Sequence, residues 1–398
     1  MKKFASKVVA VVMALVMVMG LASFAFAASD TIKVGVLAPL TGAVAQYGNA
    51  VNNGVMMYFE ELNANGGING KQVELVTYDE EGDPVKAVTG YNYLMDQGVV
   101  AIVGDVTTGP TKAVVAESQA DLTPMITASA TAEDVTCQLN EDGSVAMVYE
   151  NMFRSCFIDP FQGSKMAAFA KEQMGAGTAA ILYNTGSDYS VGLTKAFEAT
   201  AAEQGLEVVA VESYADGAVD FQSQLTNIAA KAPDVLFVPD YYSVIALVAQ
   251  QAQSAGVKAT MLGADGWDSV LGVVTDAALL EGAYYCSGYS TEDTREEVQT
   301  FVANFKAKYD TDPDMFAAQG YDAAMIMAAA IEKAEASGTK AGSDEYRQAI
   351  IDALKATDMD CVTGHVTFNE YNNQAEDRCH HQHHRRRRQV LGQLLSKR

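Results

Sequence analysis

Apolar runs alternate with amphipathic stretches along the chain from Thr31 onward. The first apolar runs, TIKVGVL, QVELVTYD and VVAIVG, have the length and β-branched content of strands, and amphipathic stretches over 44–63 and 84–97 separate them. Alternation of this kind is typical of right-handed βαβ units around a mostly parallel sheet. The pattern therefore predicts an α/β fold.

The alternation stops around 137–160, where acidic, Gly and Pro residues interrupt it, and then starts again. In this second series, strand-like runs such as TAAILY and DVLFVP separate four expected helices, at 161–174, 190–204, 221–231 and 244–255. Because 398 residues are too many for one ordinary core, we expect the break to separate two lobes.

Long helical stretches follow the second series, at 294–309, 316–336 and 344–355. Too few strands lie between them for a third domain, so we expect them to return to the first lobe and cover its sheet. The prediction is two α/β lobes joined by several crossovers, which can close on a ligand like a clam. The first lobe is expected over 28–150 and 289–361, and the second over 151–288 and 362–377.

The first 27 residues have the three-part form of a secretion signal. Three lysines precede an apolar run over 8–21, and a small-x-small pattern ends at Ala27. The run is short for a membrane span, so we expect cleavage after Ala27 and export of the rest, with an uncleaved anchor as the alternative. No cysteine lies near the cleavage site, which favours a free periplasmic protein over a lipid-anchored one.

Residues 28–377 carry all 50 acidic side chains but only 17 of the 27 basic ones, because three lysines precede this range and seven Lys or Arg follow it. The formal charge of this body is therefore −33, the difference between 17 and 50. Such a charge disfavours nucleic acid and anionic membrane surfaces as partners. It does not determine the charge of a single pocket.

Five cysteines in an exported chain raise the question of disulfides. Cys137 and Cys156 flank an acidic, Gly-containing segment that is expected to be a hairpin, so we predict a disulfide between them. Cys286 and Cys361 are the second candidate pair, and buried free thiols are the alternative. Cys379 belongs to an atypical C-terminal tail.

Small hydroxyl residues follow two of the predicted strands of the first lobe. The run VVAIVG is followed by Thr107 and Thr108, and the run PMI by Ser129 and Thr131. The carboxyl ends of neighbouring parallel strands face one crevice, and the first cluster also opens a helix, whose unpaired N–H groups attract anions. The clusters therefore predict a receptor for a small anion such as a carboxylate, and helix capping alone is the alternative.

The sequence offers little for catalysis or nucleotide binding. The segment GDVTTGPTK comes close to a phosphate-binding P-loop, but Pro110 stands where that motif needs lysine. Between residues 28 and 377 the only histidine is His365, which leaves little for a Ser-His-Asp or Cys-His arrangement. We expect no enzymatic activity, no cofactor and no metal site.

These features, in this order, resemble the leucine/isoleucine/valine-binding protein family, the exported substrate-binding proteins of ABC-type amino-acid importers. The resemblance extends from about Ile32 to Tyr371 and includes VGVLAPLTGAVAQYG, LNANGGINGKQVELVTYDEEGDP, the two hydroxyl clusters and LGADGW. It implies a type I periplasmic-binding-protein fold, an L-amino acid as ligand, and the membrane permease of an ABC transporter as partner. Branched-chain specificity rests mostly on this resemblance, and we expect a monomer.

In that family the amino acid binds between the lobes. The resemblance places its α-carboxylate at Thr108, Ser129 and Thr131. It places its α-ammonium at Asp265, where aspartate stands for the more usual glutamate.

Aromatic residues are expected to cover the ligand. The positions that match the family are Tyr47, Tyr189 and one of Tyr241 and Tyr242. Trp267 lies beside Gly and Asp in a loop, where an aromatic ring is expected to line a cleft. Phe316 and Tyr321 follow a helix start, so we expect them to pack in the core.

The chain departs from the family in two places. Some members have a disulfide between positions taken here by Gly82 and Thr107, so that bridge is absent. Residues 378–398 read RCHHQHHRRRRQVLGQLLSKR, where members continue with a short apolar strand pair. We interpret this basic tail as a shifted reading frame or an artefact and expect it to be disordered.

Three other functions stay open at this point. A ligand-sensing receptor could use the same fold, although no later membrane segment is apparent in the sequence. An enzyme acting on amides or amino acids would need catalytic groups that the sequence does not offer. A receptor for short amides or urea would have little use for Asp265.

Overall fold

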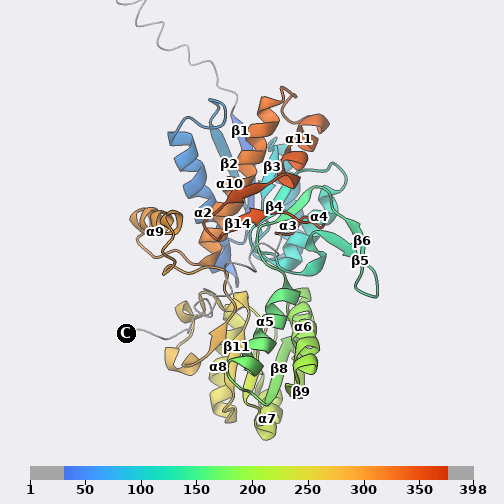
Figure 1. The fold of residues 1–398 in the computed structure, drawn as a ribbon, viewed down its shortest axis with the longest axis vertical. Helices are drawn as coiled ribbons and strands as arrows, with labels where there is room; N and C mark the ends of the chain where they lie inside the picture. The colour runs from blue at the N-terminus through green and yellow to red at the C-terminus, as the bar shows by residue number, and fades with distance from the viewer. Residues whose placement is uncertain (1–30, 375–398) are drawn as a thin grey trace, which may run out of the picture.

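The computed structural model describes residues 31–374, which form two α/β lobes, one above the other in Figure 1. The predicted signal peptide at 1–27, the tail at 378–398 and Cys379 lie outside the described residues. In the part that is described, no helix is long and apolar enough to cross a membrane.

The first lobe contains a five-stranded sheet in the order β2-β1-β3-β4-β7, and all its neighbouring strands are parallel. These strands are β1 (Ile32–Ala38), β2 (Val73–Asp79), β3 (Ala101–Val103), β4 (Met125–Thr127) and β7 (Met152–Arg154). Ile102 pairs with Met125 and Val103 with Ile126, so β3 and β4 end at nearly the same level. The loops that follow β3 and β4 therefore lie side by side at the edge that faces the second lobe.

Helices from both ends of the chain pack in this lobe: α2 (Ala45–Ala64), α3 (Pro84–Asp96), α4 (Thr108–Ser118), α9 (Glu296–Tyr309), α10 (Met315–Ala336) and α11 (Asp344–Lys355). The central pair is α2 and α10, which approach closely at two glycines. A Cβ atom on Gly54 would lie 2.1 Å from the carbonyl oxygen of Ala317, and one on Gly320 would lie 2.3 Å from that of Val51. These close approaches pack α10, one of the last three long helices, against α2 of the first lobe.

Local sequence explains where several helices begin. Asp83 precedes α3, and its side chain accepts hydrogen bonds from the N–H groups of Val85 and Lys86, while Pro84 occupies the first helical position. Asp314 and Ser343 cap α10 and α11 in the same way. Capping of this kind places helix starts within one or two residues of the sequence prediction.

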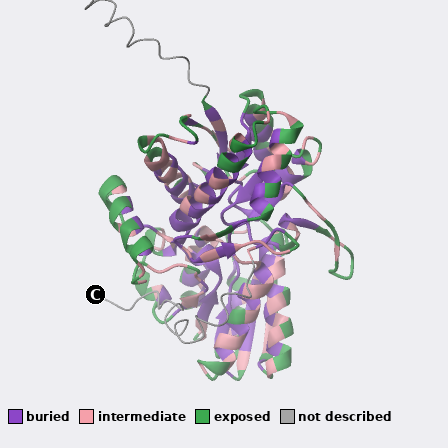
Figure 2. Ribbon diagram, turned by 45° about the horizontal axis from the view of Figure 1, so that its top comes forward, coloured by how far each residue is buried: buried purple, intermediate pink, exposed green. Residues whose placement is uncertain are grey.

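The second lobe contains another five-stranded parallel sheet, in the order β12-β11-β10-β8-β9. Its strands are β8 (Thr178–Asn184), β9 (Glu207–Tyr214), β10 (Val235–Phe237), β11 (Thr260–Gly263) and β12 (Tyr284–Tyr285). Its helices are α5 (Asp159–Glu172), α6 (Asp188–Gln204), α7 (Gln222–Lys231) and α8 (Tyr242–Ala255). The short helices η2 (Asp265–Trp267), η3 (Val270–Gly272) and η4 (Ala277–Leu280) follow β11. Figure 2 shows buried residues along the strands and exposed residues on the outer helices.

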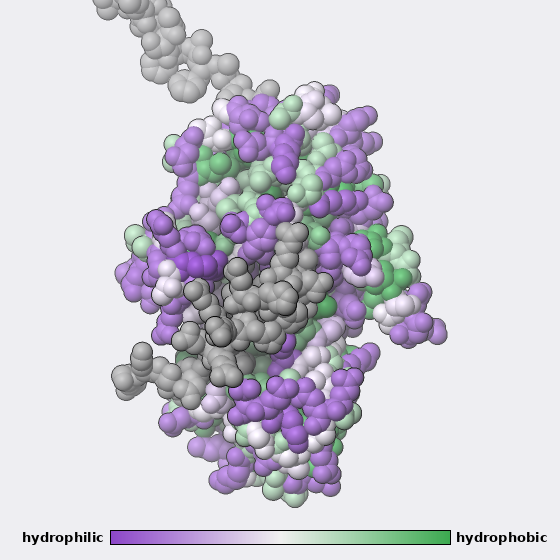
Figure 3. Space-filling model, in the orientation of Figure 1, coloured by the Kyte–Doolittle hydropathy of each residue, from purple (hydrophilic) through white to green (hydrophobic). Residues whose placement is uncertain are grey.

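Two strands after the short helix η1 (Glu133–Val135), β5 (Cys137–Leu139) and β6 (Val145–Val148), form an antiparallel hairpin that projects from the first lobe. Hydrophilic residues cover most of the face drawn in Figure 3, and apolar ones gather on this hairpin. Its Met147 is 49% exposed.

The predicted disulfides are wrong: Cys137, Cys156 and Cys361 are buried free thiols. Cys137 pairs with Val148 across the hairpin, and its Sγ donates to the carbonyl oxygen of Glu133. The hairpin is shorter than predicted, because Cys156 lies beyond β7 with its Sγ directed at the carbonyl oxygen of Ala130. Since Cys361 is a free thiol, the second candidate pair is absent as well.

The lobe boundaries also differ from the prediction. Strand β7 pairs with β4, so residues 152–154 belong to the first sheet although the second lobe was expected from 151. At the other end, β13 (Asp358–Asp360) and β14 (His365–Thr367) form a two-stranded sheet, and Asn373 bridges to Arg154 of β7.

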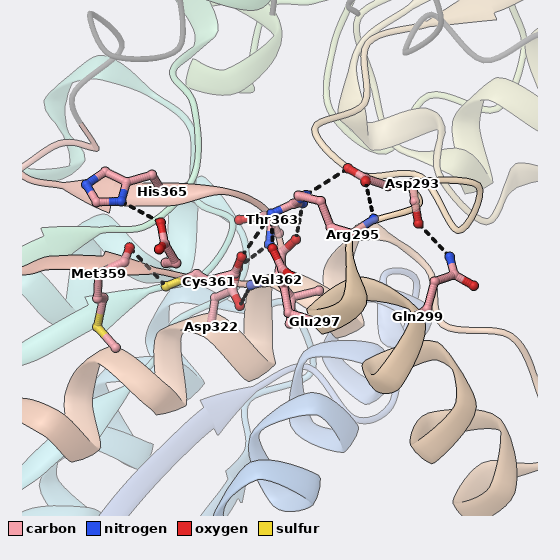
Figure 4. Close-up of polar contacts among 11 residues, drawn as sticks. Asp293, Arg295, Glu297, Gln299, Asp322, Met359, Cys361, Val362, Thr363 and His365 are labelled. Carbon is pink, nitrogen blue, oxygen red and sulfur yellow. Dashed lines mark hydrogen bonds and ion pairs between the residues drawn. The ribbon is translucent and has the colours of Figure 1, made fainter. Parts of the chain in front are cut away.

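Side chains of the first lobe hold the turn between β13 and β14. Asp322 of α10 accepts hydrogen bonds from the N–H groups of Val362 and Thr363, and Arg295 donates to the carbonyl oxygen of Val362 (Figure 4). Residues 362–374 therefore contact the first lobe, where the prediction assigned them to the second.

Candidate functional site

A small pocket lies between the two lobes and is lined by residues of both. Both sheets direct the carboxyl ends of their strands toward it. The lining residues belong to loops that follow β3, β4, β10 and β11 and to the starts of helices. They are Tyr47, Val106, Thr107, Thr108, Ser129, Thr131, Tyr189, Tyr241, Asp265, Gly266 and Phe316. The cavity thus contains both predicted hydroxyl clusters and Asp265.

The first-lobe wall begins with the loop that joins β3 to α4. Thr107 is the residue before α4, but its side chain makes no capping hydrogen bond, so capping does not account for this hydroxyl. The N–H of Thr108, at the first position of α4, faces the hydroxyl of Tyr241 across the cleft. The N–H groups at a helix N-terminus favour an anion.

The second hydroxyl loop follows β4, and hydrogen bonds to residues outside the cavity hold it in place. The hydroxyl of Thr127 accepts hydrogen bonds from the N–H groups of Ser129 and Ala130, and Arg154 donates to the carbonyl oxygens of Ala130 and Ala132. Arg154 is fully buried on β7. Sequence reasoning missed it, because its sequence neighbours do not show which loop it supports.

The two hydroxyl loops are also joined to each other. The Oγ of Ser129 donates to the carbonyl oxygen of Val106 over 2.8 Å, and the Oγ1 of Thr127 donates to that of Asp105 over 2.6 Å. The first-lobe wall is therefore a single hydrogen-bonded unit.

Asp265 supplies the acidic group of the second-lobe wall. It is 3% exposed, and its Oδ1 accepts hydrogen bonds from the hydroxyl of Tyr189 over 2.6 Å, the side-chain amide of Gln162 and the N–H of Gly266. Within residues 31–374, no group donates to its Oδ2. Burial raises the pKa of Asp265 to about 6, although these hydrogen bonds lower it.

A second buried acid, Asp159 at the start of α5, lies near Asp265 and was not predicted. Burial raises its pKa well above the ordinary value, and the charge of Asp265 raises it further, while the hydroxyl of Thr131 and the charge of Arg154 oppose the shift. The nearby cation, Arg154, makes its hydrogen bonds to backbone carbonyls and to Asn373. This side of the cleft therefore favours a positive group.

Aromatic rings from both lobes enclose the cavity. Tyr47 of α2 stacks on Phe316 with ring centroids 4.4 Å apart, and Tyr189 stacks on Tyr241 at 5.1 Å. The hydroxyl of Tyr47 donates to the carbonyl oxygen of Gly266 over 2.5 Å and thereby joins the lobes. Phe316 packs in the core as expected, and it also lines the cavity because the first turn of α10 faces the cleft.

The predicted contact of Trp267 is wrong, and of the two alternative tyrosines only one lines the cavity. Trp267 is fully buried, its Nε1 donates to the carbonyl oxygen of Val238, and a Cβ on Gly263 would lie 2.2 Å from its ring. Tyr242 packs behind Tyr47 in the core, where its N–H donates to the hydroxyl of Tyr47. Neither side chain lines the cavity, so the choice between the adjacent tyrosines falls on Tyr241.

The arrangement suits the binding of a small molecule that carries both charges. Hydroxyl and N–H donors on one wall can hold an anionic group, and Asp265 on the opposite wall can hold a cationic one. Among the residues that the structure describes, no group of three or more His, Cys, Asp and Glu side chains could hold a metal ion.

Comparison with known proteins places these features in a family. The model of the periplasmic binding protein family matches residues 31–381. The leucine-, isoleucine-, valine-, threonine- and alanine-binding protein of Pseudomonas aeruginosa is 30% identical, over 88% of this chain and 89% of the relative. A Leu/Ile/Val-binding protein of Rhizobium johnstonii is 31% identical, over 88% and 91% of the two chains.

Among solved structures, the chain is similar to the branched-chain amino acid transporter substrate binding protein LivJ from Streptococcus pneumoniae, solved in complex with isoleucine. The TM-score is 0.76 at 30% sequence identity, and the match covers 87% of this chain and 94% of the other. Together with the two-lobed fold and the site between the lobes, these matches show that the chain belongs to the periplasmic binding protein family.

Proposed function

We propose that this chain is the extracytoplasmic substrate-binding protein of an ABC importer and that it binds a free branched-chain L-amino acid between its lobes. The observation that carries the proposal is the pairing of an anion-binding wall, with Thr108, Ser129 and Thr131, with the buried acid Asp265 opposite. A zwitterion is the small molecule that satisfies both walls at once.

Each part of an amino acid has a matching group. The carboxylate lies against the N–H and hydroxyl of Thr108 and the hydroxyls of the second loop. The ammonium lies against Asp265, whose Oδ2 is available for it. The side chain lies against the stacked rings of Tyr47 and Phe316. Relatives named for leucine, isoleucine and valine support a branched-chain ligand.

The lobes close because one ligand contacts both of them. In this structure the lobes already touch, through Tyr47 and Gly266 and through the ion pair of Lys112 with Asp188. A ligand that bridges the walls gains contacts only in the closed form and so shifts the population toward it. A monomer in this closed form then presents the amino acid to the membrane permease.

Calorimetry with three matched ligands tests the proposal. L-Leucine carries both charges, leucinamide lacks the carboxylate, and 4-methyl-2-oxopentanoate lacks the ammonium. A lost charged partner costs roughly 1.5 to 3 kcal/mol, so each analogue should bind at least about tenfold more weakly than leucine. Equal affinity for all three would contradict the proposal.

A further inference from the structure

Two buried carboxyl groups lie behind the first-lobe wall without taking part in the cavity. Glu80 follows β2 and Asp105 follows β3, and both residues are 0% exposed. In the sheet order β1 lies between these strands, and beyond its end the carboxyl groups of Glu80 and Asp105 lie close enough to interact. There the N–H of Glu80 donates to the carbonyl oxygen of Ala38.

Neither carboxyl group has a sufficient set of donors. Both oxygens of Glu80 and the Oδ2 of Asp105 lack a hydrogen-bond partner among the described residues. The N–H groups of Gly82 and Asp83 lie near the Glu80 carboxylate and oppose its pKa shift, but neither makes a hydrogen bond of good geometry with a carboxylate oxygen, and the N–H of Asp83 donates to the backbone carbonyl oxygen of Glu80. Two carboxylates cannot donate to each other, so a direct hydrogen bond between them requires a proton.

The surrounding charges favour keeping that proton. Asp79 faces Glu80 from the same strand end and adds negative charge, and Lys86 is paired with Glu81 at the surface. Burial raises the pKa of Glu80 to about 7. Burial raises the pKa of Asp105 as well, and the charge of Glu80 raises it further.

We propose that Glu80 and Asp105 share one proton, and that this shared proton holds the loop over 105–108 in the shape that binds the ligand's carboxylate. Both are positioning residues, since neither lines the cavity. The second half of the proposal rests on the proposed function.

The contacts of Asp105 extend to both hydroxyl loops. Its Oδ1 accepts a hydrogen bond from the N–H of Val106 over 2.5 Å, and its carbonyl oxygen accepts one from Thr127 over 2.6 Å. The hydroxyl of Thr127 in turn accepts from the N–H of Ser129 over 3.2 Å. If the shared proton were lost, Asp105 and Glu80 would both be charged and would repel each other. This repulsion would displace the groups that contact the ligand's carboxylate.

The sign of the pH dependence follows from the raised pKa. At a pH below the pKa that these carboxyl groups have in the unfolded chain, the shared proton makes its full contribution to stability. This contribution is lost as pH rises toward 7, the pKa of Glu80 in the folded protein. Ligand affinity should then fall as pH rises through about 7, by up to about tenfold per pH unit, because one proton is linked to binding.

Glu80→Gln tests this, because its amide can donate to Asp105 at every pH. Glu81→Gln is the matched control, since it removes the same charge from the next residue, which is exposed. Two measurements are made from pH 5 to 9: the melting temperature without ligand and the affinity for L-leucine. In Asp105→Asn the amide is at position 105 and can donate to Glu80, so this change serves as a second variant if Glu80→Gln folds poorly.

We expect the melting temperature of Glu80→Gln to exceed that of Glu81→Gln by an amount that grows between pH 5 and 7. We also expect its leucine affinity to stay level from pH 7 to 9, where the affinity of wild type and control falls. A variant that keeps the wild-type pH slope in melting overturns the shared proton. Loss of the melting slope with an unchanged slope in leucine affinity overturns the positioning role.

If wild type binds no leucine at any pH, the proposed function and the positioning role fail together, while the melting curves still decide whether the proton is shared.

Discussion

Replacing Asp265 by asparagine separates the contribution of this residue to binding from its effect on stability. The Oδ1 of the new side chain can keep the hydrogen bonds from Tyr189 and Gly266, while an NH₂ group replaces the Oδ2 that is available to the ligand. An ammonium would then meet a donor where it needs an acceptor. The lost charged hydrogen bond is worth roughly 1.5 to 3 kcal/mol, or about ten- to a hundredfold in affinity.

The same change should stabilise the protein without ligand. Burial raises the pKa of Asp265 from 3.8 to about 6, so its ionised form costs about 3 kcal/mol of folding free energy at pH 7. That penalty is absent below pH 3.8 and grows as pH rises toward 6, so the variant should gain stability over wild type across this range. The sign is opposite to that of the change in affinity.

Calorimetry with L-leucine and urea unfolding without ligand measure the two effects. Asp240→Asn is the matched control: Asp240 is also buried in the second lobe with a pKa raised to about 6, but it pairs with Tyr214 and does not line the cavity. It should alter stability and leave leucine affinity within a few-fold. Unchanged affinity in Asp265→Asn, or an equal loss in Asp240→Asn, would refute the assignment of Asp265 to the ammonium.

Three further predictions concern the cleft and the cysteines. Thr108→Val with Thr131→Val should weaken leucine binding about thirtyfold, since each lost hydroxyl is worth about 1 kcal/mol, and calorimetry should show residual binding because the backbone N–H groups remain. Lys112→Met should raise the leucine dissociation rate a few-fold in stopped-flow fluorescence, since it removes the ion pair with Asp188 across the lobes, and added salt should shrink the difference. Alkylation under denaturing, non-reducing conditions, read by mass spectrometry, should label three thiols that a disulfide would protect, those of Cys137, Cys156 and Cys361.

The parts of the fold that local sequence determines could be predicted well. Alternating apolar and amphipathic runs predicted both sheets, and helices with a capping residue such as Asp83 begin close to where they were expected. The hydroxyl clusters and Asp265 were found because each follows a buried strand, and the carboxyl ends of parallel strands converge.

What the sequence could not reveal depends on contacts between distant segments. Trp267 was expected in the cleft because it follows a glycine in a loop, but its ring fills the space left by Gly263. Phe316 reaches the cavity only because α10 points its first turn at the cleft. Asp159 and Arg154 gave no local signal, since their burial side by side is visible only in three dimensions.

The way the chain threads through the lobes has a consequence for the order in which they can form. The second sheet and its helices come from one uninterrupted stretch, residues 159–285, whereas the first sheet needs α10, which ends at Ala336, to cover it. When the chain leaves a ribosome or a translocation channel with its N-terminus first, the second lobe can therefore be complete while the first lobe still lacks its last helices. Until α10 arrives, the face of α2 around Gly54 has no partner, and this exposed apolar surface is where a chaperone would act and where aggregation would start.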